Sequence, residues 1–140
     1  MEIEIHNLDR NLGISSENII NIVKNVIRTL ALDMSSCHVI FINDETLRGM
    51  HEKYLNDPDF TDVMTFNLGD DAVEGEIYIS YDRVKENAVV FDVSIENEII
   101  RNMIHGLLHL KGYKDKNESD RIIMKKKEDE LVNTCAKTGN

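Results

Sequence analysis

The chain is short of cysteine, proline and aromatic residues. It has 140 residues, with two cysteines, one proline and no tryptophan. Cys37 and Cys135 lie too far apart for a paired metal-ligand motif, and two thiols do not build a disulfide framework, so we expect a reducing compartment. The length suits one hydrophobic core, and we predict a single domain over residues 1–140.

Long hydrophobic runs are also absent. No apolar run reaches the roughly eighteen residues that would span a membrane. The N-terminal stretch MEIEIHNLDR is acidic and alternates in polarity, whereas a secretory signal peptide begins basic and continues apolar. These absences argue against a membrane protein and predict a soluble, cytoplasmic one.

Positive charge is scarce, and the formal net charge of -10 argues at first against a nucleic-acid partner. The deficit lies wholly in residues 1–80, which carry 5 Lys and Arg against 15 Asp and Glu; residues 81–140 carry 11 of each. Cations in the second part follow closely on two histidines, although a solvated helix face and loop is the simpler explanation for any single one of them. They are Lys111, Lys114, Lys116, Arg121, Lys125, Lys126 and Lys127.

Hydropathy periodicity predicts an α+β fold in the order β-α-β-α-β-β-α-α-α, a small four-stranded mixed sheet packed with about five helices. The short acidic connection between the third and fourth strands makes them antiparallel neighbours. Ser119 is the predicted cap of the last helix, and residues 136–140 are expected to fray. The expected strands are 2–5, 37–43, 61–67 and 75–80, and the expected helices are 19–30, 44–55, 82–91, 94–110 and 119–135.

The stretch HGLLHLKGYKD, residues 105–115, contains the candidate site. His105 and His109 are four residues apart, so a helix places both imidazoles on one face. Gly112 suits a left-handed helix end, and the reversed chain can return Asp115 to the same point. Two imidazoles and a carboxylate leave one tetrahedral position for water, as in a catalytic zinc site. We therefore predict one divalent metal, with zinc favoured, on His105, His109 and Asp115.

Parts of this pattern also have structural explanations. A histidine near a helix C-terminus offsets the helix dipole, and a glycine there is an ordinary helix stop. Gly106 occupies the place of the glutamate base in the H-E-x-x-H motif, so no catalytic residue is assigned beyond a metal-bound water. His6, His38 and His51 lie at strand or helix positions without partners at ligand spacing, and we interpret them as structural.

The motif resembles the signature of the YbeY family, bacterial metal-dependent endoribonucleases of ribosomal RNA maturation. The family reads H-G-x-L-H-L-x-G-Y-D-H, and residues 105–113 match it in register. Upstream, TDVMTF resembles the family strand T-D-V-L-S-F, and GEIYIS resembles the G-D-I strand. The resemblance implies a small mixed sheet packed with helices. It also implies cleavage of single-stranded rRNA in maturation and ribosome quality control, with ribosomal particles as partners.

The chain departs from the family pattern at two positions. Asp115 replaces the third histidine, and its harder oxygen leaves the choice among divalent metals open. The family places an arginine eight residues before the valine of its T-D-V strand, and Leu55 stands at that position here. Lys53, the nearest cation, would face another side of the helix.

Three functions stay open at this point. The first is the metal-dependent endoribonuclease, and the second is a ribosome-assembly factor with a mainly structural metal and little nuclease activity. The missing arginine and the missing base favour the second. The third is a hydrolase of another bond, based on the likeness to metzincin proteases. Two details are also open: Thr61 and Asp62 either line a groove or satisfy loop amides, and Tyr113 either stacks on a base or packs over the helix end.

Overall fold

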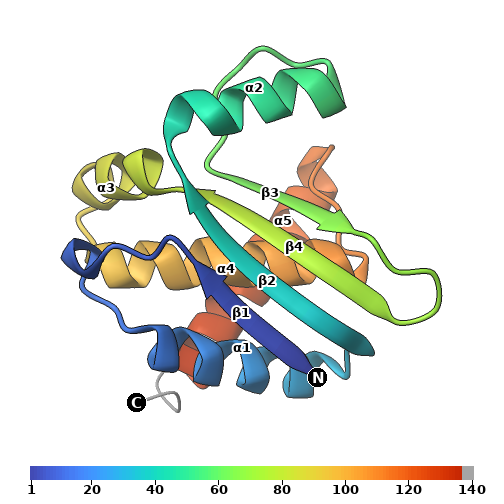
Figure 1. The fold of residues 1–140 in the computed structure, drawn as a ribbon. Coiled ribbons are helices and arrows are strands. Elements are labelled where there is room, and N and C mark those ends of the chain that lie inside the picture. The colour runs from blue at the N-terminus through green and yellow to red at the C-terminus, as the bar shows by residue number, and fades with distance from the viewer. Residues whose placement is uncertain (137–140) are drawn as a thin grey trace.

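The computed structural model describes residues 1–136 and shows a four-stranded sheet with most helices packed against one face (Figure 1). The element order confirms the predicted α+β fold class. Of the predicted frayed end, residues 137–140 lie outside the described part. The elements are β1 (Glu2–His6), η1 (Arg10–Leu12), α1 (Ser16–Leu30), β2 (Met34–Ile42), α2 (Asp44–Leu55), β3 (Val63–Asn67), β4 (Val73–Ser80), α3 (Tyr81–Val90), α4 (Ile95–Lys111), α5 (Glu118–Leu131) and η2 (Val132–Ala136).

The sheet has the order β1-β2-β4-β3, in which β1, β2 and β4 are parallel. β3 is antiparallel to β4, which confirms the prediction for these two strands. Successive side chains of a strand point to opposite faces. Cys37, Val39 and Phe41 of β2 are therefore buried under the helices, whereas His38 and Ile40 lie on the other face and are only half-buried.

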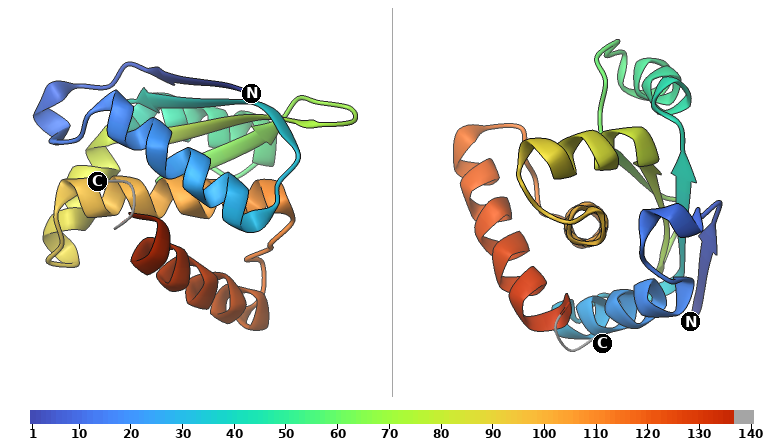
Figure 2. Two further views of the ribbon diagram at one scale, coloured as in Figure 1. Left: turned by 90° about the horizontal axis from the view of Figure 1, so that it is seen from below. Right: turned by 90° about the vertical axis from the view of Figure 1, so that its left-hand side faces the viewer.

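Helix α4 lies at the centre of the molecule. Figure 2 shows it end-on, with the sheet on one side and α1, α3 and α5 around it. Met103, Ile104, Leu107 and Leu108 of α4 are fully buried, which fixes the rotation of the helix about its axis. Because the sheet and three helices pack around α4, the position of the side chains near its C-terminal end is well defined.

The ends of α4 and α5 are set by local side chains. α4 ends at Gly112, which has the left-handed φ of 117° and was predicted to stop this helix. The prediction that Ser119 caps α5 is wrong, because the side chain of Asn117 accepts the N–H of Asp120 at 2.8 Å and starts the helix earlier. Asparagine and serine cap equally well, so the sequence alone did not separate the two.

Both cysteines are buried, and burial raises the pKa of the Cys37 thiol to about 12. Within residues 1–136, no helix combines the length and the apolar character needed to cross a membrane.

Candidate metal centre

Helix α4 and the turn that follows it bring the three predicted ligands together. Nε2 of His105 and Nε2 of His109 lie 3.1 Å apart. Oδ2 of Asp115 lies 3.2 Å from Nε2 of His105 and 3.1 Å from Nε2 of His109. All three side chains are half-buried, so the cluster is reachable from solvent. The reversal at Gly112 therefore returns the carboxylate to the histidines, as the spacing predicts.

The remaining ring nitrogens determine which atoms carry protons. Nδ1 of His105 lies 2.6 Å from Oε2 of Glu128, and Nδ1 of His109 lies 3.1 Å from the backbone carbonyl oxygen of Tyr113. A carbonyl oxygen and an ionised carboxylate only accept hydrogen bonds, so Nδ1 is the donor in both rings. In the neutral imidazoles, both Nε2 lone pairs then face the oxygen of Asp115. Three lone pairs converge on one point, an arrangement that a cation stabilises.

The spacing of these donors fits a small divalent ion. Four ligands at about 2.05 Å from a tetrahedral zinc lie about 3.3 Å from one another. The three distances of 3.1 to 3.2 Å between donor atoms are close to this value. Two imidazoles with one carboxylate, each imidazole held by an outer acceptor, are also typical of zinc sites. The residues present therefore fit a metal, whose identity the geometry alone does not fix.

The charge around His105 favours a cation at this point. Burial opposes the protonated imidazole, but the hydrogen bond and charge of Glu128, together with Asp115 and Asp62, outweigh it and raise the pKa of His105. The carboxylates that stabilise an imidazolium also stabilise a divalent ion at the same place.

Glu128 is a site residue that the sequence analysis missed. It lies on α5, is nearly buried, and accepts a hydrogen bond from Arg101 as well as from His105. It sits among charged residues in KKKEDEL, and only the packing of α5 against α4 directs it to the site. No local sequence pattern distinguishes it from its neighbours.

Glu98 is a second missed residue, and here a signal existed. It is 4% exposed, and burial, followed by the charge of Asp62, raises the pKa of its carboxyl group. Glu98, Asn102, His105 and His109 are spaced by four, three and four residues, so they form a polar stripe along a helix that is otherwise largely apolar. Helical periodicity applied to the polar residues would have indicated it.

Two grooves meet at the cluster, and His105 and Asp115 line both. The first has a volume of about 370 Å³ and is also lined by Thr61, Asp62 and Leu55. Thr61 and Asp62 thus line a groove, which was one of their two open interpretations. Leu55 is 62% exposed and lines this groove, so an apolar residue lies where the family resemblance predicts an arginine.

The second groove has a volume of about 580 Å³, and Glu98 and Phe91 line it. Phe91 is 63% exposed and offers an aromatic side chain in this groove. Tyr113 instead packs against the hydrophobic core, which is the second of its two open interpretations.

Gly106 has a steric reason to be glycine. A Cβ built at this position would lie 2.9 Å from methyl carbons of both Thr65 and Ile77. Position 106 therefore faces the sheet across a close helix–strand contact, and the glutamate base of H-E-x-x-H has no room there. The absence of that base follows from the packing of α4.

The other histidines fall into two groups. Nδ1 of His51 lies 3.0 Å from the carbonyl oxygen of Asp59, which agrees with a structural role. His6 and His38 were expected to have no partner at ligand spacing, but the structure gives them one: their rings stack, and Nε2 of His6 lies 3.0 Å from Nδ1 of His38. β1 and β2, which carry these histidines, are parallel neighbours, and the sequence analysis did not predict that register.

Comparisons with known proteins agree with the motif. The family model described as Endoribonuclease YbeY matches residues 4–136. The Endoribonuclease YbeY of Flavobacterium psychrophilum is 45% identical over 115 residues, which cover 81% of this chain and 81% of that protein. That of Bacteroides thetaiotaomicron is 33% identical over 111 residues, covering 79% and 81%. The fold is similar to the solution structure of TM1509 from Thermotoga maritima, with a TM-score of 0.60, 28% identity, and coverage of 94% and 89%.

Proposed function

Because the chain belongs to the YbeY family of endoribonucleases, we propose that it cleaves single-stranded rRNA in rRNA maturation and ribosome quality control, with a metal on His105, His109 and Asp115. Family membership makes the chain a nuclease, and thus a hydrolase with RNA as substrate. The observation that carries the metal site is the convergence of two imidazole lone pairs and one carboxylate oxygen on a single point. We propose zinc, because imidazole nitrogen is a better donor to zinc than to magnesium or calcium.

The residues around the proposed metal have separate roles. A bound divalent ion would activate water or polarise a phosphate oxygen. Glu128 and the carbonyl of Tyr113 hold the two imidazoles in the tautomer that presents Nε2. Asp115 adds negative charge next to both rings, and Arg121 donates hydrogen bonds to the carbonyl oxygens of Asp115 and Lys116 and so orders this loop.

The two grooves offer a path for a single strand across the site. Lys116 lines the first groove, and Arg121 and Lys125 line the second. These cations can contact phosphates on either side of the cleaved bond, which offsets the acidic net charge of the chain. Phe91 in the second groove offers a face on which a base can stack. Of the cations that the sequence placed near the histidines, these three are the ones that line the grooves.

The alternative is a ribosome-assembly factor with a mainly structural metal. Leu55 in the first groove favours it, since the arginine that the family resemblance predicts there would have added a cation to the groove. The donor set favours the enzyme. Structural zinc sites are closed by four protein ligands, whereas this cluster offers three and borders two open grooves. Peptide hydrolysis is the weaker proposal, because the packing around Gly106 excludes the usual base.

The test uses untagged protein and a labelled single-stranded RNA. We expect His109→Ala and Asp115→Ala to abolish cleavage, and Asp70→Ala, in the exposed β3–β4 connection, to leave it unchanged. Removal of the metal by a chelator should also abolish cleavage by the wild type, and added zinc should restore it. Co-sedimentation with ribosomal subunits is measured in parallel. Cleavage that survives in both His109→Ala and Asp115→Ala would refute the mechanism. A wild type that co-sediments with ribosomal subunits but does not cleave RNA would favour the assembly factor.

Ribosomal particles as partners and a cytoplasmic location remain predictions. So does the assignment of residues 1–140 to one metal-dependent hydrolase domain.

A further inference from the structure

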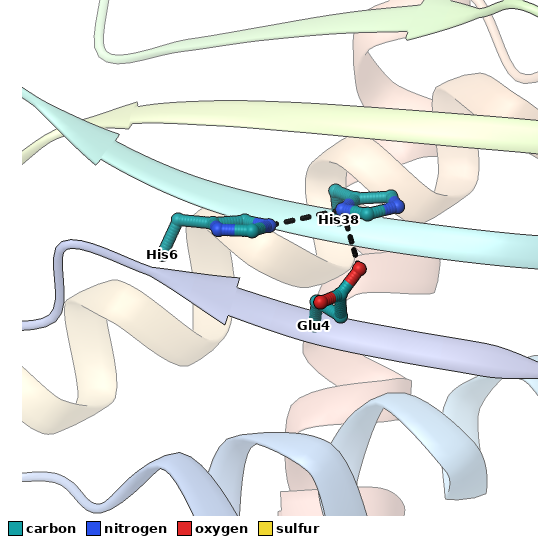
Figure 3. A group of neighbouring side chains, drawn as sticks. All are labelled: Glu4, His6 and His38. Carbon is teal, nitrogen blue, oxygen red and sulfur yellow. Dashed lines mark hydrogen bonds and ion pairs between the residues drawn. The ribbon is translucent and has the colours of Figure 1, made fainter.

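A second group of side chains of the types that ligate metals lies on the sheet face that α1, α4 and α5 do not cover. Glu4 and His6 are two residues apart on the edge strand β1, so both side chains point to the same face. His38 lies on the neighbouring strand β2, where it is the register partner of Glu4. Figure 3 shows the two imidazoles and the carboxylate directed toward one another above these strands.

Two of the three pairs of donor atoms in this group lie near ligand spacing. Nε2 of His6 is 3.0 Å from Nδ1 of His38, and Oε2 of Glu4 is 3.5 Å from the same Nδ1. All three donor atoms lie within 4.8 Å of one another. The separations of 3.0 and 3.5 Å bracket the roughly 3.3 Å between ligands of a tetrahedral zinc, and Glu4 and His6 are the more widely spaced pair.

The site is accessible and its surroundings are acidic. The side chain of His38 is 28% exposed and that of Glu4 is 47% exposed. Around His38 in the sheet register lie Glu2 on β1 and Glu74 and Glu76 on β4. Their strand positions place these carboxylates on the same face as His38, where they attract cations.

We propose that Glu4, His6 and His38 form a second metal site, which takes a first-row transition-metal ion such as zinc, nickel or copper and joins the edge strand β1 to β2. Two imidazoles with one carboxylate select such ions over magnesium and calcium, which prefer oxygen ligands. One or more remaining positions are left for water. The proposal does not depend on the catalytic function, because the two clusters share no residue and lie on different elements.

A hydrogen bond between two neutral imidazoles explains the distance of 3.0 Å without any metal, and this is the interpretation to be excluded. The two interpretations differ in stoichiometry. If both clusters bind metal, the chain takes up two equivalents of zinc; if His6 and His38 form only a hydrogen bond, it takes up one at most.

The experiment is a zinc titration of untagged full-length protein, with the bound metal measured by plasma mass spectrometry after gel filtration. We expect two equivalents for the wild type and for the control His51→Ala, which retains both donor sets. His38→Ala and His6→Ala should bind one. The double variant His105→Ala/His109→Ala should also bind one, and adding His38→Ala to it should leave close to none.

A second readout separates metal binding from a purely structural role. In the His105→Ala/His109→Ala background, zinc should raise the midpoint of thermal unfolding, and this rise should disappear with His38→Ala. Equal zinc content in wild type and His38→Ala would overturn the second site, whatever happens at the first. Zinc that binds only by joining two copies into a dimer, seen in the gel filtration, would also overturn it. The first site is tested separately, by the metal that His105→Ala/His109→Ala loses relative to the wild type. Failure of the second site and failure of the proposed catalytic site are therefore distinguishable.

Discussion

Replacing Glu128 by glutamine tests how the protein holds His105. The carboxylate accepts the Nδ1 hydrogen of His105 at 2.6 Å, which is shorter than the usual N–H···O distance of about 2.9 Å and typical of a charge-assisted bond. The side chain of Glu128 is 11% exposed, so water screens this interaction poorly. Glutamine keeps the shape but removes the charge, so the imidazole should become a weaker donor to the proposed metal.

The expected effect can be stated as an affinity. Loss of an outer partner of a metal-ligating histidine weakens metal binding about 10- to 100-fold. This corresponds to about 1.4 to 2.8 kcal/mol. Arg101 keeps Asp129 as a partner at 2.8 Å, so the substitution leaves that charge paired. We therefore expect the fold to persist and the change to be confined to the metal.

The assay is competition for zinc against a chromophoric chelator at pH 8, where protons compete least for the imidazoles. It is done in the His38→Ala background, which removes the proposed second site. The matched control is Glu130→Gln on the same helix, where the carboxylate pairs with Lys127. A dissociation constant for Glu128→Gln equal to that of the control would refute the argument that Glu128 tunes the site.

Three further outcomes follow from the packing and the charges. Gly106→Ala should destabilise the fold by about 1 to 3 kcal/mol in denaturant unfolding, because its Cβ meets Thr65 and Ile77, whereas Gly49→Ala, which meets nothing within 4 Å, should not. Cys37 should resist alkylation in the native protein, and because its pKa is raised to about 12, its contribution to stability should be complete below about pH 8.5 and be lost as pH rises toward 12. Lys116→Glu should weaken RNA binding and flatten its salt dependence, and an unchanged slope in a filter-binding titration would remove Lys116 from the RNA surface.

The fold was largely predictable because its elements have strong periodic signals. The stripe of α1 and the alternation of the strands depend only on which residues are apolar, and the order followed from them. Boundaries were harder. β4 begins at Val73, two residues before the predicted start, because its pairing with β2 extends it. Such pairing is decided by a neighbouring strand and leaves no local signal.

The candidate site was predictable where its residues are close in sequence. His105, His109 and Asp115 lie on one helix and its turn, so spacing alone placed them together. Glu128 came from another helix, and His38 came to His6 through strand pairing, so neither contact was predictable from local spacing.

The most direct test of the central claim is the metal content of His38→Ala, with and without Asp115→Ala, measured by plasma mass spectrometry on untagged protein. This background leaves only the cluster at the end of α4 as a proposed site. We predict close to one equivalent of a divalent metal in His38→Ala and a sharp fall when Asp115→Ala is added. Equal metal content in the two proteins, or none in either after zinc is supplied, would contradict the proposal that His105, His109 and Asp115 form a metal centre.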